Sequence, residues 1–511
     1  MSLNLAHYLE ISAEAYAGRT AVILDKHRYT YAEVNAFAKR IANVLVDRGI
    51  EKGDKVAMMI PNTPHFPMIY YGILNAGATV VPVNTLLKAH EIQYYLEDSD
   101  AKIFIAWRGF YDEAVHAFNE TETCHLLLVA GSPDDFTAPE EGELLNPLML
   151  EASHEFDLIE TMPDDTAVIL YTSGTTGHPK GAELTHFNVF FNAYYAKDKI
   201  IQSGPEDVVL AVLPLFHSFG QTCIMNAGLM SGATITMVPH FDTQRVIEVI
   251  ERDKVSVVAF VPTMYAFLLN AARETQCDLS SIRMAVSGAS SLPLEIITRF
   301  KERFGVQILE GYGLSETSPV ASFNVSDRPC KPGSIGLPIW GCEMRVMRED
   351  GSFAEMGEVG EIVIRGHNVM KGYFKKPVAT KETIINGWLH TGDLGKFDED
   401  GYFYIVDRLK DIIIRGGMNI YPREVEELLH AHPAVLEAAV VGVPDELRGE
   451  EVKAYVSLKS GPTATQDELK KYCLDRLAKY KCPKEIEILR ALPKGPTGKV
   501  LKRELRDLAR R

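Results

Sequence analysis

Four Ser/Thr hydroxyls, three glycines and one lysine lie together in segment 171–181, which reads Tyr-Thr-Ser-Gly-Thr-Thr-Gly-His-Pro-Lys-Gly. Glycine lets backbone N–H groups turn toward one point, and the hydroxyls and the lysine add further donors, so this composition favours an anion. The segment follows the apolar run 166–170 and precedes a helical pattern that begins near Thr185. We therefore predict a phosphate-binding loop.

This loop differs from the common nucleotide-binding motif, in which glycine precedes the lysine and Ser or Thr follows it. Here Pro179 precedes Lys180 and Gly181 follows it, which argues against a kinase or GTPase. The alternative for so Gly- and Thr-rich a segment is an ordinary surface turn, and the rest of the chain has to decide between them.

A second glycine-rich segment, 310–317, reads Glu-Gly-Tyr-Gly-Leu-Ser-Glu-Thr and follows the apolar run 306–309. A turn at the end of a parallel strand lies at the sheet edge where ligands bind. Tyr312 offers a flat face for a purine, and Glu316 offers the oxygen ligand that Mg²⁺ prefers beside substrate phosphates. The alternative is a core tyrosine and a solvated glutamate.

Two further segments end on a charged residue in a tight turn. Segment 388–393, Trp-Leu-His-Thr-Gly-Asp, presents Asp393, whose ionised carboxylate can accept two hydrogen bonds from a ribose diol. Segment 493–499, Pro-Lys-Gly-Pro-Thr-Gly-Lys, presents Lys499, and a cation at this point would favour the approach of two anions. Taken singly, the first is usually a plain turn and the second a solvated tail.

In this order and spacing, the four segments resemble the signature sequences of the adenylate-forming (AMP-binding) superfamily, which includes acyl-CoA synthetases, aryl-CoA ligases, beetle luciferases and peptide-synthetase adenylation domains. The resemblance covers nearly the whole chain and is strongest to bacterial long-chain fatty acyl-CoA synthetases. It implies ATP, Mg²⁺ and coenzyme A, with one nucleotide site serving two half-reactions.

The resemblance also implies a role for individual residues. Catalysis falls to Lys499, Glu316, Thr172 and His217, with Glu316 as the Mg²⁺ ligand. The acyl pocket comprises His217, Phe219, Gly220, Val261, Gly288 and Val320. The coenzyme A path includes Gly416 and Gly417, and Lys410 is the hinge. ATP or AMP binding falls to Thr172, Ser173, Gly174, Thr175, Thr176, Gly177, Lys180, Gly288, Ala289, Ser290, Glu310, Gly311, Tyr312, Gly313, Ser315, Asp393 and Arg408. Segment 288–291, Gly-Ala-Ser-Ser, departs slightly from the family's usual pattern.

Short apolar runs alternate with helical patterns over much of the chain, which predicts an α/β fold with largely parallel, buried strands. Thr30 and Glu33 form a capping box for a helix that reaches toward Gly49, and further helices are expected over 242–252, 263–273, 293–304 and 465–479. The polar stretch 131–147 reads as a surface excursion. From Gly336 shorter strands predict a smaller β-rich lobe.

The charged run 407–411 marks the expected domain boundary. We expect a large N-terminal AMP-binding domain over 1–407, a hinge at 408–410 and a small, mobile α+β C-terminal domain over 411–511. The C-terminal domain would carry both Lys499 and the coenzyme A glycines.

Composition excludes several other classes. The net charge of -16 argues against nucleic-acid binding, and the seven cysteines are scattered without metal-ligand spacing, as in a reducing cytoplasm. No run approaches the roughly 18 apolar residues of a membrane span, so we expect no transmembrane segment, although transient membrane contact stays open. The chain would act as a monomer or a homodimer.

The substrate depends on the acyl segment. Residues 213–220 contain no acid to bind an α-amine, and residues 216–230 contain neither Lys nor Arg for a second carboxylate, so an apolar monocarboxylic acid is expected. We predict an AMP-forming ligase for medium- or long-chain fatty acids. The alternatives are an aryl (4-coumarate-like) CoA ligase and, more remotely, a non-catalytic nucleotide- or acyl-binding relative.

Overall fold

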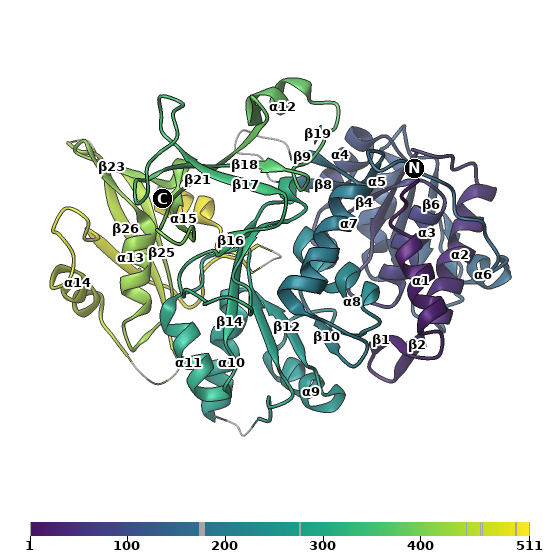
Figure 1. Cartoon of the computed structure of the whole chain (residues 1–511), viewed down its shortest axis with the longest axis horizontal. Helices are drawn as coiled ribbons and strands as arrows, with labels where there is room; N and C mark the ends of the chain where they lie inside the picture. The colour runs from purple at the N-terminus through teal and green to yellow at the C-terminus, as the bar shows by residue number, and fades with distance from the viewer. Residues whose placement is uncertain are drawn as a thin grey trace.

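The computed structural model describes residues 2–172, 179–274, 277–445, 447–459, 461, 463–495 and 498–509. Within these ranges the strands form four sheets. Figure 1 shows the N-terminal elements in purple on the right, the last elements in green and yellow on the left, and strands β17, β18 and β21 above and between them.

The nine-stranded sheet has the order β16-β15-β14-β13-β12-β10-β11-β1-β2. Strands β1 and β10 to β14 pair in parallel, and antiparallel pairs close both ends. Strands β12 and β13 are buried throughout, as their continuous apolar sequences require. The bounds are β1 (Thr20–Leu24), β2 (His27–Thr30), β10 (Val208–Ala211), β11 (Thr234–Met237), β12 (Val257–Phe260), β13 (Met284–Ser287), β14 (Ile308–Gly313), β15 (Val320–Phe323) and β16 (Leu337–Pro338).

The eight-stranded sheet has the order β19-β9-β8-β4-β3-β5-β6-β7. Its strands β3 to β8 pair in parallel, whereas β9 returns antiparallel beside β8 and β19 joins β9 antiparallel. The bounds are β3 (Lys55–Met59), β4 (Thr79–Pro82), β5 (Ala101–Trp107), β6 (Leu126–Ala130), β7 (Glu143–Leu144), β8 (Thr166–Thr172), β9 (Lys180–Thr185) and β19 (Gly372–Tyr373).

Helices cover both sheets. The largely apolar α3 is buried at every residue, whereas α9 and α11 bury one apolar face each. The bounds are α1 (His7–Ala15), α2 (Tyr31–Asp47), α3 (His65–Asn75), α4 (Ala89–Ser99), α5 (Tyr111–Asn119), α6 (Leu145–Glu151), α7 (His186–Tyr195), α8 (Ala227–Met230), α9 (Thr243–Asp253), α10 (Pro262–Glu274) and α11 (Leu294–Phe304), with π-helical turns η2 (Ala196–Ile201) and η3 (Gly220–Asn226).

A smaller sheet forms the β-rich lobe, with the order β17-β18-β21-β20 and β22 on β21. It presents the turn before Asp393 toward the nine-stranded sheet, because Asp393 contacts Tyr312 of β14. The bounds are β17 (Cys342–Met347), β18 (Gly360–Gly366), α12 (Pro377–Thr383), β20 (Ile384–Ile385), β21 (Trp388–Phe397) and β22 (Phe403–Arg408).

The last sheet has the order β24-β23-β26-β25 with β27 on β26, and it has a hydrophobic core of its own around Val425, Val440 and Val456. Such a core is what an independently packed unit requires. The bounds are β23 (Ile413–Arg415), β24 (Met418–Ile420), α13 (Pro422–His430), β25 (Val435–Asp445), β26 (Gly449–Leu458), α14 (Gln466–Leu474), β27 (Glu485–Ile488) and α15 (Lys502–Ala509).

The observed architecture confirms the predicted α/β fold class with a β-rich lobe and a small C-terminal unit. The capping box of Thr30 and Glu33 is present at the start of α2. Segment 131–147 is exposed or half-buried over 132–143, as predicted for a surface segment, and only its end is buried, in β7 and the start of α6. One local expectation was wrong. Helix α14 stops at Leu474, because the chain tightens into a turn in which Arg476 N donates to Cys473 O.

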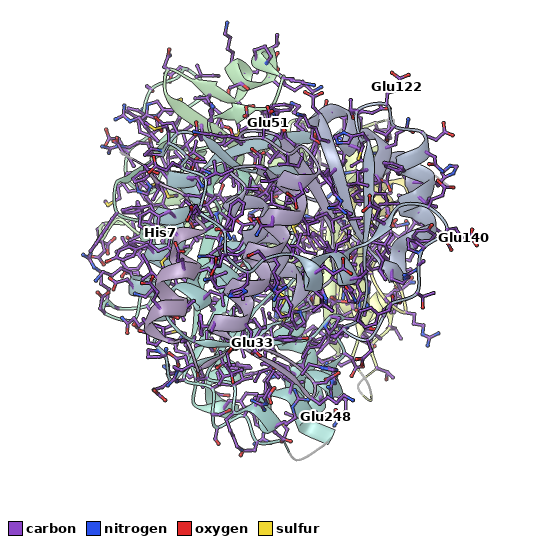
Figure 2. The ribbon with its side chains drawn as sticks, turned by 90° about the vertical axis from the view of Figure 1, so that its right-hand side faces the viewer. His7, Glu33, Glu51, Glu122, Glu140 and Glu248 are labelled. Atoms are coloured by element: carbon purple, nitrogen blue, oxygen red, sulfur yellow. The ribbon has the colours of Figure 1, made fainter. Side chains whose placement is uncertain are left out.

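The surface of the N-terminal part carries exposed acidic side chains. Figure 2 shows Glu33, Glu51, Glu122, Glu140 and Glu248 spread over this face, and all five are exposed. Their distribution agrees with the net charge of -16. Among the described residues, no helix combines the length and apolar character that crossing a membrane requires.

Candidate active site

The predicted phosphate loop connects two antiparallel strands. Thr172 at the end of β8 pairs with Lys180 at the start of β9, and helix α7 begins only after β9, capped by Thr185. The nucleotide residues Ser173, Gly174, Thr175, Thr176 and Gly177 lie outside the described residues. The strand that follows the loop distinguishes this arrangement from the strand–loop–helix of common nucleotide-binding loops.

Glu316 lies beside the base of this loop, in the short turn η4 (Ser315–Thr317). Its Oε1 accepts hydrogen bonds from Thr172 Oγ1 at 3.3 Å and from Tyr373 Oη at 2.9 Å. The described residues hold no group of three or more His, Cys, Asp or Glu side chains suited to a metal. A single carboxylate here fits Mg²⁺, which is commonly bound by one or two carboxylates together with substrate phosphates.

Asp393 is held at the centre of the site by two partners from different elements. Arg408 Nε lies 3.0 Å from its Oδ1, and Tyr312 Oη donates to its Oδ2 at 2.6 Å. Asp393 is 3% exposed, and burial, the charge of Asp393 and this hydrogen bond all raise the pKa of Tyr312. A carboxylate has about four acceptor positions, so capacity for a ligand diol remains.

The turn before Asp393 is fixed by a residue that the sequence did not single out. Glu361 of β18 accepts the Gly392 N–H at 2.9 Å on one oxygen and lies 2.7 Å from His390 Nδ1 through the other. One carboxylate therefore ties both ends of the turn 390–392 to the neighbouring strand. The partners are 29 and 31 residues apart, and only the strand pairing brings them together.

Three of the predicted nucleotide-binding residues, Gly288, Ala289 and Ser290, directly follow β13 in the nine-stranded sheet. Gly288 is buried and Ala289 has a φ of +68°, a left-handed conformation that non-glycine residues adopt mainly where the surroundings enforce it. Glu310 lies on the next strand, where its Oε1 accepts Leu292 N–H at 3.1 Å and its Oε2 has no protein partner. Burial raises the pKa of Glu310 to about 7.

Lys499 reaches this site from the C-terminal unit. Burial, together with the positive charges of Arg408 and Lys410, lowers its pKa to about 8, although Asp393 and Asp411 oppose the shift. Gly498 fits closely against the end of β12, since a Cβ there would lie 3.1 Å from Cγ2 of Val261. The C-terminal loop is thus docked into the nucleotide region.

His217 faces the same centre. Burial, reinforced by the charge of Lys499, lowers the pKa of His217 to about 4, so its imidazole is neutral near pH 7. Its Nδ1 accepts the Phe219 N–H at 3.3 Å. The nearby Ser218 and Ser315 hydroxyls lie 3.5 Å apart, which links this segment to the turn that carries Glu316.

The other predicted acyl residues make close contacts of their own. Phe219 packs on Gly288, whose added Cβ would lie 3.2 Å from the ring. Gly220 is required by close backbone contact, since a Cβ would lie 2.5 Å from Pro214 O. Val261 contacts the Lys499 loop, and Val320 is buried on β15 opposite Gly313.

The predicted hinge residue lies near the docked loop, whereas the predicted coenzyme A residues are exposed. Lys410 is in the short turn η5 (Leu409–Asp411), directly after Arg408. Gly416 and Gly417 are exposed at a tight turn with φ values of +58° and +82°, and a Cβ at either would meet nothing within 4 Å. Two of the predicted groups, the lysine and the glycines, therefore do not meet in this arrangement.

Family models match most of the chain. The AMP-binding enzyme model matches residues 9–374, and the model of the AMP-binding enzyme C-terminal domain matches residues 424–499. The chain belongs to the AMP-binding enzyme family. The family prediction is therefore confirmed.

A curated relative, the long-chain-fatty-acid--CoA ligase of Bacillus subtilis (strain 168), is 38% identical, and the match covers 98% of this chain and 94% of the relative.

Two solved structures of one protein, MatB, with and without ATP, can each be aligned with this chain. ATP-bound MatB from Rhodopseudomonas palustris aligns with a TM-score of 0.91, and apo MatB aligns with a TM-score of 0.80. In both cases the identity is 33% and the match covers 99% of each chain. At equal identity, the chain therefore aligns more closely with the ATP-bound MatB structure than with the apo structure.

Proposed function

We propose that this AMP-binding enzyme is a long-chain fatty acyl-CoA ligase that forms AMP. A fatty acid and ATP give an acyl-adenylate and pyrophosphate, and coenzyme A then displaces AMP to give the thioester. The observation that carries the proposal is the close fit of Gly498 against Val261 and Thr263, which brings the neighbouring Lys499 within electrostatic range of Asp393, Arg408 and His217. In the proposed complex, that cation lies beside the approaching carboxylate and phosphate.

In the first step, a carboxylate oxygen of the acid attacks the α-phosphorus of ATP, and the bond to pyrophosphate breaks with its electron pair on the leaving group. Asp393 and Arg408 position the ribose, and Lys499 offsets the negative charge of the two reacting anions. Glu316 would hold Mg²⁺, which neutralises phosphate charge when bound. Because His217 is neutral, it can lie beside the substrate carboxylate without forming an ion pair that would compete with Lys499.

In the second step, the thiolate of coenzyme A attacks the acyl carbonyl, and the bond to AMP breaks with its electron pair on the phosphate. Lys499 lies near the proposed site in the present arrangement, so we expect it to withdraw before the thiol enters. We place the hinge at 408–410, between domains 1–407 and 411–511. Rotation there would bring Gly416 and Gly417 to the thiol path.

The substrate class follows from the apolar surroundings of His217. Segment 216–230 contains no Lys or Arg, and most of its residues are buried, so it suits an alkyl chain and offers no partner for a second carboxylate. The long-chain relative favours a fatty acid over the aryl alternative. We further propose that the reaction takes place in the cytoplasm.

The test separates the two half-reactions. Exchange of pyrophosphate into ATP should require palmitate or a similar acid and should proceed without coenzyme A. Adding coenzyme A should then convert the bound acyl-adenylate to a thioester, detected by mass spectrometry, with release of AMP. Exchange that needs no acid, or an adenylate that coenzyme A never consumes, would contradict the proposal.

A further inference from the structure

Tyr373 lies at the junction of the phosphate loop and the Glu316 turn, although no sequence motif pointed to it. It belongs to the two-residue strand β19, which pairs with β9 directly after the loop: Tyr373 lies opposite Ala182, and Phe374 N donates to Gly181 O at 2.8 Å. Segment 370–374 therefore forms the edge of the sheet on which the loop is anchored.

The side chain of Tyr373 contacts both charged groups of this region. Its Oη donates to Glu316 Oε1 at 2.9 Å, and the Lys180 Nζ lies 5.2 Å from its ring centroid. The main chain adds a further link, because Met370 N donates to Glu316 O at 2.9 Å. One tyrosine thus connects a carboxylate and a lysine that lie 136 residues apart in the sequence.

Each contact has a defined physical effect. A phenol that donates to one carboxylate oxygen fixes the rotation of the carboxylate and leaves the other oxygen directed elsewhere, which is how outer-shell donors orient metal ligands. A ring beneath an ammonium group attracts the cation and limits its positions. Burial and the charge of Glu316 raise the pKa of Tyr373, so the phenol remains a donor at neutral pH.

We propose that Tyr373 is a positioning residue that orients Glu316 toward Mg²⁺ through its hydroxyl and holds Lys180 toward the nucleotide phosphates through its ring. The inference rests on the proposed function, because it names the support of that same site. A tyrosine that served only to fill space would need neither the hydroxyl contact nor the cation above its ring.

Two substitutions separate the hydroxyl from the ring. Tyr373→Phe removes only the donor, and Tyr373→Leu removes both contacts. Tyr402 provides a matched control, because its Oη donates to Pro329 O at 2.6 Å and Lys331 Nζ lies 4.8 Å from its ring. It therefore has a similar pair of contacts, to a backbone carbonyl and a lysine, at a place without predicted nucleotide residues, and Tyr402→Phe is the control variant.

The measurement is ATP binding by calorimetry, without acid or coenzyme A, in saturating Mg²⁺ and in EDTA. Tyr373→Phe should reduce the gain in affinity that Mg²⁺ provides by about 10- to 100-fold, with binding in EDTA unchanged. Tyr373→Leu should also weaken binding in EDTA, by about two- to fivefold. Combining Tyr373→Phe with Glu316→Gln should cause no loss beyond that of Glu316→Gln alone.

The inference is overturned if Tyr373→Phe retains the full Mg²⁺-dependent gain, or if Tyr402→Phe loses as much of it. Thermal melting of each variant identifies a general loss of structure, and conversion of supplied acyl-adenylate to thioester should be equal in wild type and Tyr373→Phe. Failure of the proposed function gives a different result, because the wild-type chain would then form no acid-dependent AMP.

Discussion

The protonation of Lys499 should control the adenylation step. Its burial beside Arg408 lowers the pKa from its ordinary value of 10.5 to about 8, and the proposed role requires the charged form. The rate of adenylation at low substrate should therefore fall as pH rises through about 8. The phosphates of bound ATP would stabilise the charged form of Lys499 and raise its pKa. Once the enzyme is saturated with ATP, the decline in the adenylation rate should therefore appear at higher pH.

The magnitude follows from the pKa. Lowering it from 10.5 to about 8 corresponds to roughly 3 kcal/mol, which is the cost of keeping an ammonium group in the docked loop without an anion. The anionic substrates offset this cost, so the cation stabilises the site most when they are present. Loss of one preorganised donor of this kind reduces the rate about 10²- to 10³-fold.

The assay is acid-dependent exchange of pyrophosphate into ATP between pH 6.5 and 9.5, without coenzyme A so that no thiol titrates. The pH dependence of kcat/KM for ATP reflects the pKa of Lys499 in the free enzyme, so kcat/KM should decline with an apparent pKa near 8. The value of kcat reflects the ATP complex and should decline only at higher pH. In Lys499→Ala the decline with pH should vanish, and the rate of pyrophosphate exchange should fall about 10²- to 10³-fold. A wild-type profile that stays flat, or a decline that persists in Lys499→Ala, would refute the reasoning.

Four further outcomes are expected. Gly417→Leu should slow thioester formation more than pyrophosphate exchange, because its Cβ meets nothing within 4 Å here, although the φ of +82° strains any non-glycine residue; equal damage to both steps would argue against a thiol path. Asp393→Ala should raise the KM for ATP about 10- to 100-fold, through lost hydrogen bonds to a charged group, and leave the KM for the acid nearly unchanged; the reverse pattern would place this residue elsewhere. Glu361→Gln should raise the KM for ATP by a smaller factor than Asp393→Ala, and an effect on the acid instead would exclude its role in the turn. Gly288→Val should shift the preferred acid to shorter chains, since its Cβ would lie 3.2 Å from Phe219; an unchanged chain-length profile would remove both residues from the pocket.

Local sequence signals predicted much of the fold. The capping box of Thr30 and Glu33 marks the start of α2, because the bonds it makes lie within four residues of each other. Continuous apolar runs predicted the buried parallel strands, because a strand that is buried on both faces needs apolar residues at successive positions. The end of α14 was not predicted, because no glycine or proline marks the turn after Leu474, in which Arg476 N donates to Cys473 O.

The candidate site was predicted where its residues lie in compact segments, as with Asp393 and Glu316. Tyr373 and Glu361 were missed because their roles depend on partners 57 and 31 residues away, which meet only through strand pairing. Periodicity carries no information on such contacts. The two-residue strand that holds Tyr373 is also too short to give a strand pattern.

The most direct test of the account is AMP formation that depends on coenzyme A, measured with acids from acetate through octanoate to palmitate, together with benzoate and a hydroxycinnamate. We predict a maximum of kcat/KM among the longer straight-chain acids, with a steep decline toward acetate. A maximum among the aromatic acids would contradict the proposed substrate, and no AMP with any acid would contradict the proposed ligase activity itself.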